Sequence, residues 1–471
     1  MPARSSHLFD LVVIGAGSAG LAAAQRAAQL GARTALIERV PAGDSGIPPG
    51  CTPNTTPGDG AAWSQRVAQC LRLSGPALRP GAWTDAVART RAEVARLREA
   101  HLARLTAAGV QWLSAEVSLR GRGIVRLRND AGKTVLRARQ IVLDAGGRST
   151  PLAVPGGELA GTADDVLGWD ALPASLILVG GGVVAVELAS TLARFGVRAV
   201  VLAREPRVLA DFDSAVSEAA ALALADGGVE VIVDAEVVRV ERDAINGGGV
   251  AVYVSVGGQD TPRVLRAQRV LSAGGPNPDT AGLGLETAGV SLDARGRIPV
   301  DRHFRTRARG IHAIGDAGRT VQHTAVAEAQ GRYVAERIFG KGAKLPDMGA
   351  VPMAVFCDPA IAAVGLTEAE ARMRWPDRAD IDRRPAPERI DVVVRRFVSL
   401  EQRVAGRGME SLIKLVCNAR SGRVLGAHIV DNAAPEIIQA LAVAVRLGVR
   451  LKHLRATIGL HPTVAQELLA V

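Results

Sequence analysis

LVVIGAGSAGLAAAQRAAQLGARTALIE, residues Leu11–Glu38, begins with branched apolar residues and then turns through three glycines. The apolar run predicts a short strand buried in a parallel sheet. The Ala-rich stretch after the glycines predicts a helix, which a further glycine ends before a second apolar strand. Strand, turn, helix and strand in this order predict the start of an α/β domain with a parallel sheet.

The three glycines stand in the spacing G-x-G-x-x-G, and each has a physical role. Gly15 permits a tight turn from strand to helix, Gly17 lets the main chain approach a pyrophosphate, and Gly20 lets helix and strand pack closely. The helix N-terminus offers free N–H groups and a positive dipole end to phosphates. Glu38, at the tip of the second strand, suits the paired hydroxyls of an adenosine ribose. These residues predict a dinucleotide site.

Length and composition are those of an ordinary globular protein. The 471 residues are enough for about three domains. Hydrophobic residues make up 48% and charged residues 22%, and no apolar run reaches the length of a membrane span. The net charge of +10 comes from scattered arginines, and aromatic residues make up only 3%. Without a basic run or stacking aromatics, we expect no nucleic-acid binding.

The four cysteines, Cys51, Cys70, Cys357 and Cys417, are far apart in the sequence. They form no C-x-x-C pair and no cluster with histidine, so we expect neither a disulfide framework nor a metal site. The residues before the first strand are too few and too polar for a signal peptide, which favours the cytoplasm.

The opening pattern recurs in the middle of the chain. Leu176–Val179 predicts a strand, and Gly180, Gly182 and Ala185 form G-x-G-x-x-A. A helix and a further strand are predicted next, at Val186–Phe195 and Ala199–Leu202. Two such units predict two nucleotides and electron or hydride transfer between them. The alternative is a relic of gene duplication with one inactive site.

The second unit differs from the first at the end of its second strand. An acidic residue there selects a free ribose, whereas an arginine accommodates a 2′-phosphate. Arg204 stands at this place and favours NADPH, although the neighbouring Glu205 leaves the ribose role of NADH open.

The rest of the chain supplies further elements. Pro- and Gly-rich sequence at Asp44–Gly60 predicts a loop. An amphipathic helix is predicted at Ala86–Ala107, and Gly310–Ala317 predicts an apolar strand ending in Gly315-Asp316, where ligands bind in α/β sheets. The other predicted elements are a helix at Ala61–Leu73, strands within Gln111–Leu143, a helix from His323, a hairpin of Leu412–Val416 and Val424–Val430 turning at Arg420–Gly422, and a helix at Pro435–Leu447.

With these motifs in place, the chain resembles the class I pyridine nucleotide–disulfide oxidoreductases, which include glutathione reductase, dihydrolipoyl dehydrogenase and mercuric reductase. The resemblance runs the full length. It is carried by GAGSAG with Glu38, GGGVVAVE at Gly180–Glu187, AIGDA at Ala313–Ala317, VFCDPAIAAVGLTE at Val355–Glu368, and HPT at His461.

The resemblance implies an α/β fold with two Rossmann-like nucleotide-binding domains and a C-terminal α+β dimerisation domain. An FAD-binding domain at 1–150 and 273–346 would be split around an NAD(P)H-binding domain at 151–272. Residues 347–471 would form the interface of a homodimer.

The resemblance also implies which residues bind the cofactors and act near them. Glu187 would reach the flavin and the nicotinamide, with an exposed helical glutamate as the alternative. Asp316 would bind the ribityl chain of the flavin, with a structural cap as the alternative. The FAD-binding residues implied are Gly15, Gly17, Ser18, Ala19, Gly20, Glu38, Arg39, Gly146, Asp316 and Ala325, and those for NADPH or NADH are Gly180, Gly182, Val183, Arg204 and Gly275.

The chain departs from this family at the redox-active cysteines. The family pattern is C-x-x-x-x-C followed by a proline and a lysine, and here only Gly50-Cys51-Thr52-Pro53 remains. Gly46 stands where the first cysteine belongs, and Asn54 and Thr55 follow the proline in place of the lysine. Cys51 is either a thiol against the flavin or an inert remnant. Thiol–disulfide exchange needs an attacking and a resolving thiol, so this pathway is expected to be lost.

A further departure lies near the C-terminus. The family pairs the catalytic histidine with a glutamate five residues later, whereas His461 is followed there by Gln466, with Glu467 one position beyond. His461 is either a proton donor to a reduced acceptor or a packing residue at the dimer interface.

The sequence thus predicts an FAD-dependent enzyme that passes two electrons from NADPH directly to a small acceptor such as a quinone. The alternatives are a single-cysteine disulfide reductase that works through a mixed disulfide, and a non-catalytic or redox-sensing flavoprotein.

Overall fold

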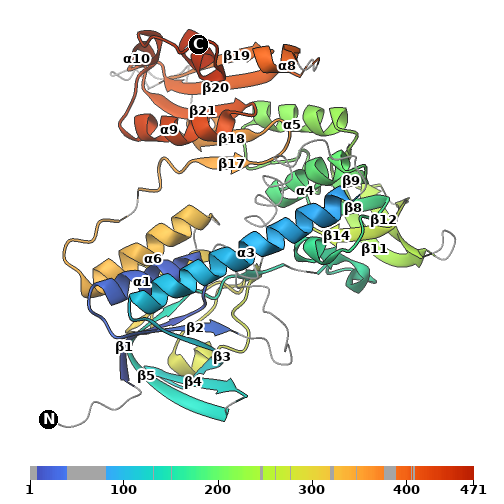
Figure 1. Cartoon of the computed structure of the whole chain (residues 1–471). Helices are drawn as coiled ribbons and strands as arrows, with labels where there is room; N and C mark the ends of the chain where they lie inside the picture. The colour runs from blue at the N-terminus through green and yellow to red at the C-terminus, as the bar shows by residue number, and fades with distance from the viewer. Residues whose placement is uncertain are drawn as a thin grey trace.

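The computed structural model describes residues 8–39, 81–130, 132–149, 151–243, 248–259, 261–275, 277–318, 323–345, 347–375, 389–404, 406 and 409–471. The predicted loop at 44–60, the predicted helix at 61–73, and Cys51 and Cys70 lie outside these residues. The described elements gather around a first sheet near the N-terminus, a second sheet beside it and a C-terminal sheet at the top of Figure 1.

The predicted βαβ unit forms the centre of the first sheet. β1 (Leu8–Ile14) lies between β2 (Thr34–Arg39) and β5 (Gly132–Leu143) and is parallel to both. β3 (Gln111–Leu119) extends the parallel part beyond β2, and β16 (Ile311–Ala313) extends it beyond β5. The C-terminal half of β1 is fully buried, as expected for a strand covered on both faces.

Two helices far apart in the sequence cover one face of this sheet. α1 (Ser18–Gln29) and α6 (Thr324–Phe339) lie side by side in Figure 1. Their contact is close because Gly331 of α6 faces α1, where a Cβ atom would lie only 2.1 Å from the carbonyl oxygen of Ala19. β4 (Ile124–Asn129) pairs antiparallel with both β3 and β5, and these three are the strands predicted within Gln111–Leu143.

Replacing Gly331 by alanine should therefore force α1 and α6 apart. Overpacking of this kind typically costs about 1–3 kcal/mol, and we expect a lower thermal midpoint and weaker FAD retention. Gly168→Ala is the matched control, because a Cβ atom there meets nothing within 4 Å. Equal thermal midpoints for the two variants would contradict the close contact.

The second sheet repeats the arrangement. β8 (Ser175–Val179) lies between β9 (Arg198–Leu202) and β14 (Arg269–Ser272). β10 (Glu230–Ile232) extends the sheet beyond β9 and β7 (Gly161–Thr162) beyond β14, and all of these pairs are parallel.

Helices and a smaller sheet complete this region. α4 (Val183–Arg194) begins three residues earlier than predicted, directly after the glycine turn, and α5 (Ser214–Asp226) follows β9. β11 (Ala235–Asp243), β12 (Gly249–Val256) and β13 (Arg263–Ala267) form an antiparallel sheet.

Short elements mark the passages between the two sheets. β6 (Gly147–Arg148) leaves the first sheet and pairs antiparallel with β15 (Asn277–Pro278), which returns to it. The 3-10 helices η1 (Gly157–Leu159), η2 (Ala163–Gly168) and η3 (Leu285–Ala288) lie on the connecting segments.

The C-terminal sheet is antiparallel. Its order is β17 (Met353–Val355), β18 (Ile361–Gly365), β21 (Val424–Val430), β20 (Ser411–Asn418) and β19 (Ile390–Phe397). β20 and β21 form the predicted hairpin. The predicted helix at 435–447 is α9 (Ala434–Arg446), and the shorter helices of this region are α7 (Glu368–Arg374), α8 (Leu400–Val404), α10 (Leu451–Arg455), α11 (Val464–Glu467) and η5 (Leu468–Ala470).

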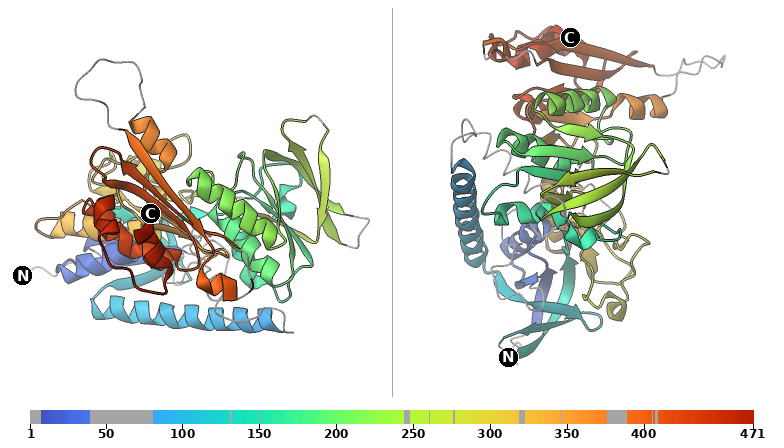
Figure 2. Two further views of the ribbon diagram at one scale, coloured as in Figure 1. Left: turned by 90° about the horizontal axis from the view of Figure 1, so that it is seen from above. Right: turned by 90° about the vertical axis from the view of Figure 1, so that its right-hand side faces the viewer.

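One long helix connects the first two sheets. α3 (Ala82–Ala107) begins four residues before its predicted start and lies along one side of the molecule in both views of Figure 2. Leu105 at its C-terminal end is buried in the core of the first sheet, and Trp83 at its N-terminal end is buried in the core of the second. The Trp83 indole donates a 3.0 Å hydrogen bond to the carbonyl of Trp169. The predicted amphipathic helix is therefore anchored at both of its ends.

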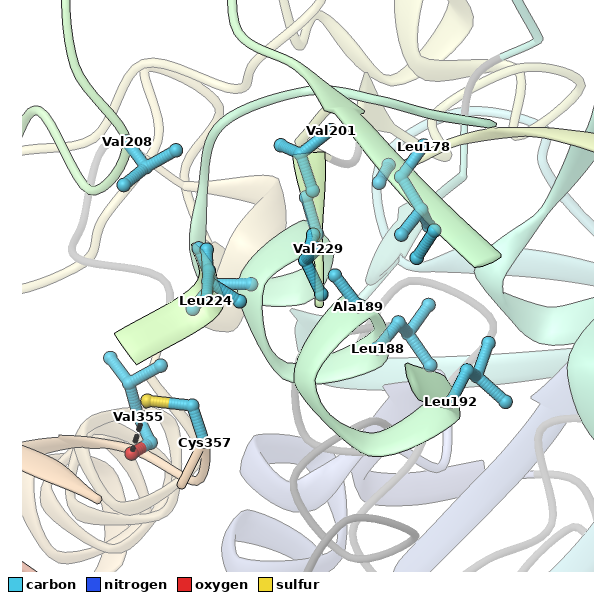
Figure 3. Close-up of a cluster of buried hydrophobic side chains, with 14 of the residues drawn as sticks. Leu178, Leu188, Ala189, Leu192, Val201, Val208, Leu224, Val229, Val355 and Cys357 are labelled. Atoms are coloured by element: carbon cyan, nitrogen blue, oxygen red, sulfur yellow. Dashed lines mark hydrogen bonds between the residues drawn. The ribbon is translucent and has the colours of Figure 1, made fainter. Parts of the chain in front are cut away.

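The second sheet and the C-terminal sheet share one hydrophobic core. Leu188 and Leu192 of α4 lie in the same hydrophobic cluster as Val355 and Cys357, which belong to the C-terminal region (Figure 3). Cys357 and Cys417 are both buried; Cys357 lies just beyond β17 and Cys417 lies in β20.

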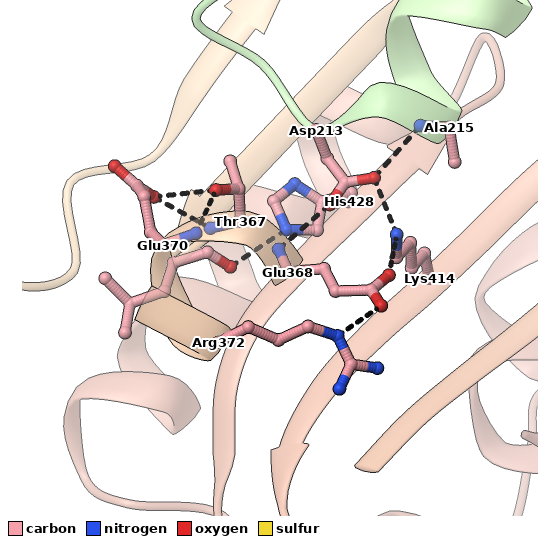
Figure 4. A network of polar contacts seen from close by, with 9 residues as sticks. Asp213, Ala215, Thr367, Glu368, Glu370, Arg372, Lys414 and His428 are labelled. Atoms are coloured by element: carbon pink, nitrogen blue, oxygen red, sulfur yellow. Dashed lines mark hydrogen bonds and ion pairs between the residues drawn. The ribbon is translucent and has the colours of Figure 1, made fainter. Parts of the chain in front are cut away.

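A buried polar cluster joins the same two regions (Figure 4). The Lys414 ammonium on β20 lies 2.8 Å from Asp213 Oδ1 and 2.6 Å from Glu368 Oε2, and the Lys414 and Asp213 side chains are 4% and 1% exposed. Asp213 also caps α5 by accepting from the amide of Ala215. On the neighbouring strand β21, His428 Nε2 lies 3.0 Å from the carbonyl oxygen of Leu366. Charges are therefore paired across the boundary between the two sheets.

Candidate functional site

The first glycine turn has the geometry that the motif requires. Gly15 has a φ of +106°, and a Cβ atom there would lie 1.8 Å from the carbonyl oxygen of Asp144. A Cβ atom on Gly20 would lie 2.2 Å from the carbonyl oxygen of Gly15. Both positions therefore exclude any side chain, and the strand, the turn and α1 are packed against each other as predicted.

The N-terminus of α1 has free donors for an anion. Gly17 is the N-cap and has no side chain to satisfy the first amides. Within the described part of the chain, the amides of Ser18 and Ala19 have no hydrogen-bond partner. Because two free amides and a helix dipole converge here, the turn fits the pyrophosphate of FAD.

Glu38 lies at the end of β2 and is 4% exposed. Burial raises its pKa, while Arg98 of α3, whose Nη2 is 3.8 Å from Glu38 Oε2, and a hydrogen bond with Trp112 act against that rise. The carboxyl is held at the strand tip where the ribose was expected. Arg39 instead binds the returning segment, since its Nη1 donates to the carbonyl oxygen of Asp279 at 2.5 Å.

A second set of predicted FAD residues lies where β5 and β16 end. Gly146 has a φ of +65°, and Asp316 is buried in the 3-10 turn η4 (Gly315–Ala317). The Gly315 amide donates a 3.0 Å hydrogen bond to Oε1 of Gln330, which α6 holds fully buried. Ala325 is exposed in the first turn of the same helix. β1, β5 and β16 are parallel neighbours, so these residues share one edge of the sheet with the glycine turn.

The second glycine turn is similar to the first. Gly180 has a φ of +141°, and a Cβ atom there would lie 2.7 Å from the carbonyl oxygen of Ala273. Gly182 is the extended N-cap of α4, and Val183 is its first residue. Gly275 lies beyond the end of β14, with open space where a Cβ atom would stand. These residues form a cradle of small side chains at the start of α4, which fits a nucleotide pyrophosphate.

Arg204 follows β9 and points into solvent. Its side chain is 81% exposed and makes a 3.5 Å ion pair with Glu205, which is 57% exposed. A contact of this kind in water is weak. The guanidinium therefore remains available for a phosphate at the place predicted for the adenosine ribose.

Glu187 was predicted to act near the flavin and nicotinamide, with an exposed helical glutamate as the alternative. The structure excludes the exposed alternative, because Glu187 is 0% exposed. Its Oε1 accepts a 2.8 Å hydrogen bond from the amide of Phe356. The carboxylate therefore bridges α4 and the segment after β17.

His461 is exposed in the single chain. Its Nδ1 lies 3.0 Å from Oε1 of Gln466, whereas the Glu467 carboxylate binds Arg395, with 2.6 Å between Arg395 Nε and Oε2. The partner of His461 is therefore the amide at the family's glutamate position.

The two described cysteines, Cys357 and Cys417, are both buried. Burial raises the pKa of Cys417 to about 11, so this thiol stays protonated at neutral pH. The Cys357 thiol donates to the carbonyl of Pro359 at 3.1 Å. Cys51 itself lies outside the described residues.

Sequence reasoning missed Asp144, Arg98 and Gln330. Asp144 interrupts an apolar strand end, VLDAGG, and this single carboxyl in a buried context was the available signal. Arg98 and Gln330 lie in ordinary helical patterns, which gave none.

Comparisons with known proteins agree with this arrangement. Residues 9–331 match the family described as pyridine nucleotide-disulphide oxidoreductase, and residues 351–470 match its dimerisation domain. Glutathione reductase of Burkholderia cepacia is 33% identical over 464 residues, 98% of each chain. Dihydrolipoyl dehydrogenase of Corynebacterium glutamicum is 30% identical over 472 residues, 98% of this chain and 96% of the relative.

The fold is similar to solved structures as well. The HOCl-induced flavoprotein disulfide reductase RclA from Escherichia coli superimposes with a TM-score of 0.82 at 24% identity, over 98% of this chain and 99% of that one. Among the described helices of this chain, none has the length and apolar character needed to cross a membrane.

Proposed function

The chain belongs to the pyridine nucleotide–disulphide oxidoreductase family, and on that premise we propose that it passes two electrons from NADPH through FAD directly to a small acceptor such as a quinone. The family uses FAD and NAD(P)H, and its dimerisation domain supports a homodimer. The acceptor, the site residues and the domain limits 1–150, 151–272, 273–346 and 347–471 are part of the proposal.

The observation that carries the proposal is the set of thiols. Gly46 supplies no sulfur where the family has its attacking cysteine. Cys357 and Cys417 are buried in the C-terminal region, so neither replaces it. Cys51 is thus the only cysteine left in the segment where the family has C-x-x-x-x-C, and the dithiol relay of that segment has no second member.

The described residues have distinct roles in this proposal. FAD, when bound, accepts a hydride from the nicotinamide and supplies electrons to the acceptor. Ser18 and Ala19 bind its pyrophosphate through their amides, and Glu38 binds its ribose. Glu187, fixed by the Phe356 amide, shapes the junction of the two nucleotide sites. His461, oriented by Gln466, donates a proton to the reduced acceptor from the dimer interface.

Two measurements test this function. Anaerobic addition of NADPH should bleach the flavin, and a simple quinone should then restore its colour. Steady NADPH oxidation should require the quinone. If NADPH does not reduce the flavin, the result would instead support the alternative of a non-catalytic or redox-sensing flavoprotein.

Arg204 gives a separate prediction for the nucleotide. A charge-assisted contact to the 2′-phosphate is worth roughly 1.5–3 kcal/mol. We therefore expect Arg204→Glu to lower kcat/KM for NADPH by about ten- to a hundredfold while leaving NADH nearly unchanged. Arg198→Glu, at the opposite end of β9, is the matched control. If the unmodified protein prefers NADH, Glu205 is the ribose-binding residue instead.

A further inference from the structure

Asp144 has no role in the function proposed above, yet it lies against the first glycine turn. It follows β5 directly, and its amide donates to the carbonyl of Ile14 at 2.8 Å. Its backbone lies against Gly15, where a Cβ atom would lie 1.8 Å from the Asp144 carbonyl oxygen. The residue is thus part of the wall of the phosphate-binding turn.

The Asp144 carboxyl lies against two further segments of the FAD site. Oδ2 accepts a buried 2.7 Å hydrogen bond from the amide of Gly20, the third residue of α1. Oδ1 would lie 2.6 Å from a Cβ atom on Gly315, so only glycine fits beside it. The side chain thus lies between α1 and η4, while the backbone of the same residue lies against the glycine turn.

The charges around Asp144 do not favour its ionised form. Burial raises its pKa to about 7, the Gly20 amide acts against this rise, and the Asp316 carboxylate of η4 adds to it. The elements packed against it contribute the Gly20 amide from α1, backbone from the Gly15 turn, and Asp316. None of these groups carries a positive charge.

The neighbouring amides are the ones that fit an anion. Asp144 satisfies Gly20, which leaves Ser18 and Ala19 for the pyrophosphate. A pyrophosphate bound there lies next to the Gly20 amide that Asp144 accepts from. The negative charges of the pyrophosphate and of an ionised Asp144 would therefore repel each other at close range in a low-dielectric site.

We propose that Asp144 is a positioning residue of the FAD site and that its proton is coupled to FAD binding, so that the protein binds FAD more tightly with this carboxyl protonated. When the carboxyl is protonated, its carbonyl oxygen still accepts the hydrogen bond from the Gly20 amide. The negative charge of Asp144 next to the phosphates is then absent. At a pH where Asp144 is ionised in the free protein, FAD binding takes up one proton from solvent at Oδ1 or Oδ2. Asp144→Asn is the neutral isostere of the favoured state.

The sign of the pH dependence follows from linkage. Suppose that bound FAD raises the pKa of Asp144 by one unit. The affinity of the protein for FAD then falls about tenfold as pH rises from the pKa of the free protein through that of the FAD complex. Full-length apoprotein titrated with FAD should therefore show a Kd about tenfold higher at about pH 8.5 than at about pH 6. In Asp144→Asn the Kd should stay within about twofold over the same range.

Two controls separate this coupling from other groups. Asp10→Asn removes a carboxylate of β1 that pairs with Arg139, and should keep the slope of the unmodified protein. His323, the N-cap of α6, has its pKa lowered by burial, and His323→Gln should keep the slope as well.

Calorimetry in two buffers of different ionisation enthalpy gives a second readout. It should detect uptake of up to one proton per FAD at about pH 8 in the unmodified protein and none in Asp144→Asn. A flat Kd in the unmodified protein, or a slope that persists in Asp144→Asn, would overturn the proposal. Either result leaves the acceptor chemistry untouched, because the measurement involves no NADPH and no acceptor.

Discussion

Replacing Cys51 by serine should leave NADPH-dependent quinone reduction within about twofold of the unmodified rate, whereas glutathione disulfide, lipoamide and mercuric ion should be poor substrates of both proteins. Rates below the range typical of enzymes, roughly 1–1,000 per second, are expected for the disulfides and for mercuric ion. The reason is that no attacking thiol stands at Gly46. Cys51→Ser should still alter the long-wavelength absorbance of the oxidised flavin if the thiol lies against the ring.

Cys70→Ser is the matched control for this experiment, because it removes the other thiol that lies outside the described residues. It should change neither the spectrum nor the quinone rate. Loss of quinone reduction in Cys51→Ser, with NADPH still bleaching the flavin, would contradict direct transfer. The single-cysteine mechanism through a mixed disulfide would then explain the protein better.

Replacing Lys414 by methionine should strongly destabilise the folded protein. It leaves Asp213 buried without its cation, and breaking a buried pair in this way typically costs about 3–5 kcal/mol. We expect a clearly lower thermal midpoint of the FAD-saturated protein at neutral pH. Arg372→Met is the matched control: Arg372 also binds Glu368, at 2.8 Å, but is 45% exposed, and such surface pairs are worth about 0–1 kcal/mol.

The pH dependence of this effect has a definite sign. Burial alone would raise the pKa of Asp213, but hydrogen bonds led by that from Lys414 leave it lowered. Burial alone would lower the pKa of Lys414, but the two carboxylates leave it raised. The carboxylate therefore contributes stability above its unfolded pKa of 3.8, and the ammonium below its unfolded pKa of 10.5. The destabilisation should be full at neutral pH and shrink as acid protonates Asp213.

A triple variant distinguishes charge from packing. Asp213→Asn and Glu368→Gln added to Lys414→Met remove the unpaired charges, and Asn can still cap α5. This variant should recover most of the lost thermal stability. If it is no more stable than Lys414→Met, lost packing of the lysine stem explains the effect instead.

Local physics made much of the fold predictable. Both glycine turns, the helices after them and the β20–β21 hairpin follow from spacing and periodicity, because each is determined by nearby residues. Glu38 was predicted at a strand tip and is found there. Helix starts were less well predicted: α4 begins at Val183, directly after the glycine turn, and α3 begins at Ala82, next to the Trp83 side chain that is buried in the core of the second sheet.

The residues that were missed depend on distant contacts. Asp144 meets Gly20 across 124 positions, and Lys414 meets Asp213 across 201. In the sequence each is a single charged residue in an apolar strand segment. This pattern indicates that the residue is buried but does not reveal which residue it pairs with. The partner of His461 was also left open between Gln466 and Glu467, because only the path of the last helix decides it.

The anchoring of α3 has a consequence for how this protein can be recombined with its relatives. With Leu105 in the core of the first sheet and Trp83 in that of the second, one rigid rod of 26 residues fixes the spacing between two nucleotide cradles. The second nucleotide unit is therefore not an exchangeable cassette. A chimera that swaps it alone replaces the surface that receives Trp83 and the carbonyl of Trp169. A functional chimera should require that the first turns of α3 are exchanged together with the second nucleotide unit, although α3 precedes that unit in the sequence and would be left out of a simple swap.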